Sequence, residues 1–165
     1  MSYYIGLPLL LLFALIEASV LPMFRVAGLQ PNIVLVLLVA WLMLRGPGEA
    51  FVFIAVAGVC IGLVDGAPLG TALLALSPLF LVQEARGTQL SEQSFVLAVV
   101  FTVLTTFAFH LIYLAVFTLQ GQAGDWPAAV LRVFIPTAFL NVIVLLPTYF
   151  FLSAASQDLR RAGYV

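Results

Sequence analysis

Long apolar stretches separated by short polar breaks dominate the chain. They predict six helical segments, at residues 3–24, 31–44, 50–64, 69–82, 95–119 and 128–152. An α-helix rises about 1.5 Å per residue, so the first, fifth and sixth segments can cross the roughly 30 Å apolar core of a bilayer. The pattern predicts an all-α, polytopic membrane helix bundle of about six transmembrane helices, several of them short, in a single domain over residues 1–165.

The three consecutive segments between residues 31 and 82 are shorter than the roughly 20 residues of an ordinary span. The breaks between them, at 45–49 and 65–68, each contain glycine and proline, which favours separate helices. Two alternatives stay open: two longer spans over residues 31–82, or a re-entrant segment. If the short segments do cross, either loop residues extend them or the bilayer thins around them.

Arginine is the chain's only strongly basic residue type, and its distribution predicts the orientation. In a six-span arrangement one side holds both termini and four arginines: Arg45, Arg86, Arg160 and Arg161. The other side holds Arg25, together with Arg132 at the start of the last segment. Because cytoplasmic loops carry the excess of basic residues, both termini are predicted to be cytoplasmic. Five spans would place the termini on opposite sides.

Composition excludes several classes of function. Charged residues make up 8% of the chain and hydrophobic residues 64%, whereas an average soluble domain has about 25% charged residues. Net charge is −1 and no basic cluster is present beyond Arg160-Arg161, which argues against a nucleic-acid partner. The single cysteine, Cys60, gives no disulfide or zinc spacing, and the chain has no lysine for a phosphate-binding loop. We therefore expect no enzymatic activity, no metal and no cofactor.

A few polar side chains lie within the apolar segments. Glu17 interrupts the first one, where an ionisable group costs at least about 2.5 kcal/mol unless it pairs or reaches water. It either contacts a ligand or partner inside the bundle, or pairs with Arg25 near the outer headgroups after Pro22 ends the helix. His110 and Asn141 are predicted to be hydrogen-bonded structural residues, with Asn141 bridging helices.

Four glycines recur every four residues around Asp65: Gly58, Gly62, Gly66 and Gly70. On a helix the first two form a smooth face that lets a neighbouring backbone approach closely. The last two lie around a turn, where glycine also permits positive φ. We predict tight helix packing as the main role of this pattern, with a binding role for Asp65 as the second interpretation.

Pro31-Asn32 opens a run of branched aliphatic residues, which ends in the sequence WLMLRGP at 41–47. The glycine-rich third segment ends in GAPLG at 66–70. With these motifs, residues 31–82 resemble the bacterial rod shape-determining protein MreD family. In that family an acid often occupies the position of Gly62. Here the acid is Asp65, three residues later and on roughly the same helix face.

The resemblance implies a non-enzymatic component of the cell-elongation machinery in the bacterial inner membrane. Such a protein binds the bitopic membrane protein MreC, and through it connects MreB filaments to the glycosyltransferase RodA and its transpeptidase, which organises peptidoglycan synthesis.

The same family is similar in fold to the substrate-binding subunits of vitamin-uptake (energy-coupling factor) transporters, which are six-helix bundles. The alternative function is therefore capture of a vitamin. A vitamin cavity needs several converging polar side chains. The outward half of the bundle offers few candidates for a partner contact or a cavity: Glu17, Arg25, Asn32 and, depending on the number of spans, Asp65.

Overall fold

Helices make up most of the structure. The computed structural model describes residues 2–23, 28–45, 50–64, 66–68, 70–82, 95–122 and 124–161. Three of its helices are long and apolar enough to cross a membrane: Gly6–Met23, Phe95–Leu119 and Trp126–Ala154. Three shorter apolar helices lie between the first and second of these: Ile33–Leu44, Phe51–Leu63 and Thr71–Val82. The predicted all-α helix bundle is confirmed, while the number of membrane spans stays a prediction.

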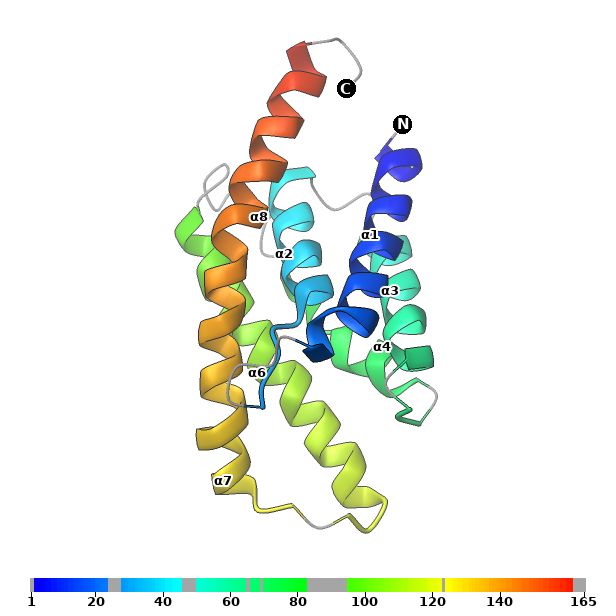
Figure 1. The fold of residues 1–165 in the computed structure, drawn as a ribbon, viewed down its shortest axis with the longest axis vertical. Helices are drawn as coiled ribbons and strands as arrows, with labels where there is room; N and C mark the ends of the chain where they lie inside the picture. The colour runs from blue at the N-terminus through cyan, green and yellow to red at the C-terminus, as the bar shows by residue number, and fades with distance from the viewer. Residues whose placement is uncertain are drawn as a thin grey trace.

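The first apolar segment forms a helix that ends earlier than predicted. Helix α1 (Ser2–Ser19) is followed by the short 3-10 helix η1 (Leu21–Met23) instead of continuing to residue 24. Pro22 lies inside η1 and has no backbone N–H with which to continue an α-helix. The α-helix therefore ends at Ser19, close to the start of the next helix, α2 (Ile33–Arg45; Figure 1).

Helix α2 (Ile33–Arg45) is the centre of the bundle. Every residue from Val34 to Leu44 is at most 5% exposed, and the helix packs against α1, α3, α6 and α8. A helix that is apolar on all sides must be kept from water, and here the neighbouring helices cover it. The predicted start at Pro31 is wrong by two residues, because Asn32 adopts the position that precedes the first helical residue and caps the helix.

The next two helices pack against each other on one side of the bundle (Figure 1). Helix α3 (Ala50–Val64) has the predicted bounds. Helix α4 (Thr71–Leu76) starts two residues later than predicted and is interrupted at 77–78, after which 79–82 are helical again. Pro78 lacks the N–H that an unbroken α-helix would use there. Helix α3 also packs on α1, and α4 packs on α6.

The last two segments form the longest helices. Helix α6 (Phe95–Leu119) has the predicted bounds. After the loop, α7 (Trp126–Ala129), the π-helical turn η3 (Val130–Phe134) and α8 (Ile135–Arg161) follow one another without a break. The predicted end at 152 is wrong, because the helix continues to Arg161. The start of α1 and the end of α8 lie at the same end of the molecule (Figure 1).

Candidate functional site

Polar side chains gather at the start of α2, inside an otherwise apolar bundle. The Asn32 side chain caps the helix, since its Oδ1 accepts a hydrogen bond of 2.8 Å from the backbone N–H of Leu35. Glu17 of α1 also reaches this helix end, and its Oε2 accepts a hydrogen bond of 2.7 Å from the N–H of Val34. A carboxylate is favourable there because the helix N-terminus carries partial positive charge. Two backbone N–H groups that have no partner within α2 are thereby satisfied.

Asn141 of α8 completes this arrangement from the opposite side. Its Oδ1 accepts a hydrogen bond of 2.7 Å from the backbone N–H of Asn32, and its Nδ2 donates one of 2.9 Å to Oγ1 of Thr106 on α6. Asn32, Thr106 and Asn141 are all buried. We call Glu17, Asn32, Thr106 and Asn141 the polar junction. It joins α1, α2, α6 and α8 through hydrogen bonds.

The polar groups of α6 continue from the junction along the helix. The hydroxyls of Thr106 and Thr102 donate to the carbonyls of Thr102 and Ala98, at 2.7 and 2.8 Å. Nδ1 of His110 lies 2.9 Å from the carbonyl oxygen of Thr106, so this nitrogen carries the proton and donates. The His110 ring lies 5.3 Å from the ring of Phe134. These groups bind within their own helix, which satisfies them in an apolar surrounding.

Two of the four candidate contact residues are therefore brought together, and two cannot be placed. Glu17 and Asn32 accept hydrogen bonds from two consecutive backbone N–H groups at the start of α2. Arg25 and Asp65 lie outside the described residues. The predicted interhelical hydrogen bonding of Asn141 is confirmed. Sequence reasoning missed Thr106, whose hydroxyl is the partner of Asn141.

The glycine pattern divides into two roles in the structure. A Cβ atom on Gly58 would lie 2.9 Å from the Cα of Leu73, so α3 and α4 approach closely there. A Cβ atom on Gly62 would lie 3.7 Å from the Cβ of Ala72, which is an ordinary contact. Between the two helices, two further glycines have positive φ: Gly66 (63°) and Gly70 (92°). The close approach thus depends on Gly58, and the turn on the later pair.

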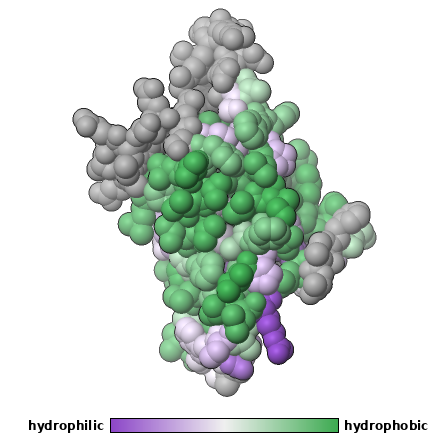
Figure 2. Space-filling view, turned by 90° about the vertical axis from the view of Figure 1, so that its left-hand side faces the viewer, coloured by the Kyte–Doolittle hydropathy of each residue, from purple (hydrophilic) through white to green (hydrophobic). Residues whose placement is uncertain are grey.

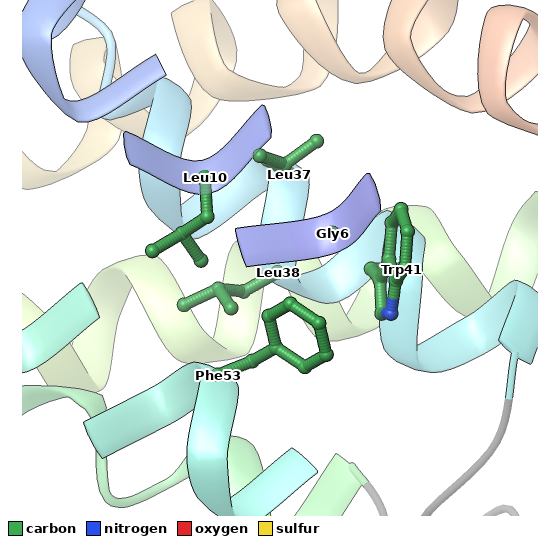
Figure 3. Close-up of a pocket in the computed structure, with 6 residues that line it drawn as sticks. All are labelled: Gly6, Leu10, Leu37, Leu38, Trp41 and Phe53. Atoms are coloured by element: carbon green, nitrogen blue, oxygen red, sulfur yellow. The ribbon is translucent and has the colours of Figure 1, made fainter. Parts of the chain in front are cut away.

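A small apolar cavity lies where α1, α2 and α3 meet (Figure 3). It has a volume of about 10 Å³ and is lined by Gly6, Leu10, Leu37, Leu38, Trp41 and Phe53. Ligand pockets usually measure about 300–1,000 Å³, whereas this volume is about that of one water molecule. Gly6 is needed for the packing, because a Cβ there would overlap the Phe53 ring and lie 2.9 Å from the Trp41 ring. This part of the bundle is filled by side chains and does not form a small-molecule site.

Among the residues that the structure describes, no group of three His, Cys, Asp or Glu side chains lies close enough together to hold a metal ion. The polar junction instead offers hydrogen bonds between helices, which is an arrangement for holding the bundle in one shape. Comparison with protein-family models, curated proteins and solved structures finds no match for the chain.

Proposed function

We propose that this chain is a non-enzymatic scaffold of the bacterial cell-elongation machinery that binds an MreC-like bitopic membrane protein. The sequence resemblance of residues 31–82 to MreD supports the proposal. Through that partner the chain connects MreB filaments with RodA and its transpeptidase. The proposal places the protein in the bacterial inner membrane, with both termini cytoplasmic.

The observation that carries the proposal is that the side chains of the polar junction bind to one another and to the backbone. Glu17 and Asn32 accept hydrogen bonds from the first turn of α2, and Asn141 uses both ends of its amide group. In a vitamin-binding subunit such groups would converge on an empty cavity. Here they converge on the start of a buried helix, which favours a scaffold over a small-molecule carrier.

Six crossings of the membrane fit this proposal best. The start of α1 and the end of α8 lie at the same end of the molecule (Figure 1), as an even number of crossings requires. Four of the six arginines belong to that side in a six-span arrangement. The three short apolar helices then cross as well as the three long ones.

Depletion of this chain from a rod-shaped bacterium that encodes it tests the proposal. We expect the cells to widen and become round over a few generations, because wall synthesis loses its link to the MreB filaments. A plasmid copy of the wild-type gene should restore the rod shape, and added vitamins should not. Cells that stay rod-shaped and stop growing only in vitamin-free medium would contradict the proposal and favour the transporter subunit.

A further inference from the structure

The apolar surface on the side formed by α3 and α4 is short when measured along the helix axes, which is the direction in which the bundle would cross a membrane. Helix α3 has 15 residues, which corresponds to about 22 Å. The apolar stretch Thr71–Val82 is shorter still, at about 18 Å. Polar sequence bounds both stretches, with RGPGE at 45–49 before α3, Asp65 after it and QEARG from residue 83.

The opposite side is much taller. Helix α6, which packs on both α4 and α8, has an apolar stretch of 25 residues, or about 37 Å, and the last helix continues apolar after the exposed Arg132 from 133 to 154, or about 33 Å. Exposed apolar side chains run along the last helix from Leu131 to Phe151, about 30 Å apart. Figure 2 looks onto the left-hand side of Figure 1, where α8 lies, and this side is hydrophobic over most of its coloured surface. In Figure 1, α6 and α7 also extend below the connection between α3 and α4.

Tilting the molecule cannot remove this difference. A tilted helix projects a shorter length onto the membrane normal, so tilt can fit α6 and the last helix to a core of roughly 30 Å. Tilt only shortens the projection of α3, which starts at about 22 Å. Helix α2 is also short, but it is buried and meets no lipid.

The exposed side chains of α3 and of residues 71–82 are typical of a surface that contacts lipid and not of one that contacts another protein. Among the described residues of 51–63 and 71–82, the exposed side chains are apolar apart from Ser77, and several are large: Phe51, Leu63, Leu74, Phe80 and Leu81. Membrane helices recognise each other through small residues and polar contacts, because lipid chains are as apolar as leucine. This surface offers little of either.

We propose that the side formed by α3 and α4 contacts lipid acyl chains in a bilayer that is locally thinned to about 20 Å, while the α8 side spans a core of ordinary thickness. The bilayer deforms because exposing apolar side chains to water, or polar loops to hydrocarbon, costs more than thinning, which costs only fractions of a kcal/mol per Å. The inference goes beyond the scaffold role and holds whichever protein partner the chain binds.

Spin labels that report depth in dioleoylphosphatidylcholine vesicles test this inference. Single cysteines for labelling are introduced in a Cys60→Ala background. One pair, Phe51 and Leu63, lies at the two ends of the exposed apolar side chains of α3, which we call the α3 strip. The other pair, Leu131 and Phe151, lies at the two ends of those of the last helix, which we call the α8 strip. Relative accessibility to oxygen and to a water-soluble nickel chelate gives the depth of each label. We expect both pairs to have the same mean depth, close to the headgroups.

If the bilayer is not thinned, the mean depth of the two α3 labels should differ from that of the two α8 labels. This difference is the same wherever the α3 strip lies along the membrane normal. Phe51 and Leu63 are about 18 Å apart along the helix, so in a core of roughly 30 Å their mean depth would be about 6 Å greater than that of the α8 pair. That difference would overturn the inference. Labels at Phe51 and Leu63 that neither reagent reaches would also overturn it, because a protein would then cover this side.

Discussion

Replacing Asn141 by leucine should lower the free energy of unfolding by about 1–3 kcal/mol. The variant keeps a similar volume but removes two hydrogen bonds, those to the Asn32 N–H and to Thr106 Oγ1. The Asn32 N–H is then left buried without its acceptor, which costs the full desolvation of that group. The loss should therefore exceed the small average contribution of hydrogen bonds between membrane helices, about 0.6 kcal/mol.

Unfolding of the purified protein by sodium dodecyl sulfate, followed by circular dichroism, measures this difference. Thr148→Val is a matched control on the same helix, because the Thr148 hydroxyl donates only to the carbonyl of Val144 at 2.8 Å. It should change stability much less than Asn141→Leu does. Equal effects of the two variants would mean that the polar junction contributes nothing specific to holding the helices together.

A single methyl group on Gly58 should be the second strongly destabilising change, at about 1–3 kcal/mol. In Gly58→Ala the new Cβ would lie 2.9 Å from the backbone Cα of Leu73, so α3 and α4 must move apart. Gly62→Ala is the matched control, since its Cβ would meet Ala72 at the ordinary distance of 3.7 Å. Alanine is also the better helix former, so the control should be neutral or slightly stabilising.

Folded yield in membranes and the midpoint of thermal unfolding in detergent distinguish the two glycine variants. The sequence alone predicts that bulky residues at Gly58 and Gly62 are both harmful, whereas the structure separates the two positions. If Gly62→Ala loses as much stability as Gly58→Ala, the close approach of α3 and α4 is not centred where the structure places it.

Helix bounds could be predicted from the sequence where polar runs lie at both ends of an apolar stretch. That condition holds for α3 and α6, whose predicted bounds agree with the structure. It fails for α8, because helix formation does not need apolar residues and the polar sequence SQDLRR continues the helix to Arg161. The start of α2 was predicted from Pro31, although asparagine just before an apolar run is itself a signal for a helix cap.

The polar junction could be predicted only in part. Glu17 and Asn141 stand out because polar side chains are costly in apolar helices. Their partners depend on how the helices cross: Thr106 lies 35 residues from Asn141, and the partner of Glu17 is the backbone of α2. Gly6 was missed because it belongs to no repeating pattern, and only the structure brings the Phe53 and Trp41 rings against it.

Affinity capture of the tagged chain from gently solubilised bacterial membranes, with mass spectrometry of what is bound, tests the scaffold role most directly. The account predicts near-stoichiometric recovery of an MreC-like bitopic protein and no bound vitamin. Arg25→Gln should weaken that recovery at unchanged expression, whereas Glu17→Gln should not, because Glu17 binds the Val34 N–H inside the bundle and the glutamine keeps an acceptor oxygen for it. Stoichiometric retention of a vitamin together with an ATPase pair, and no bitopic partner, would contradict the account.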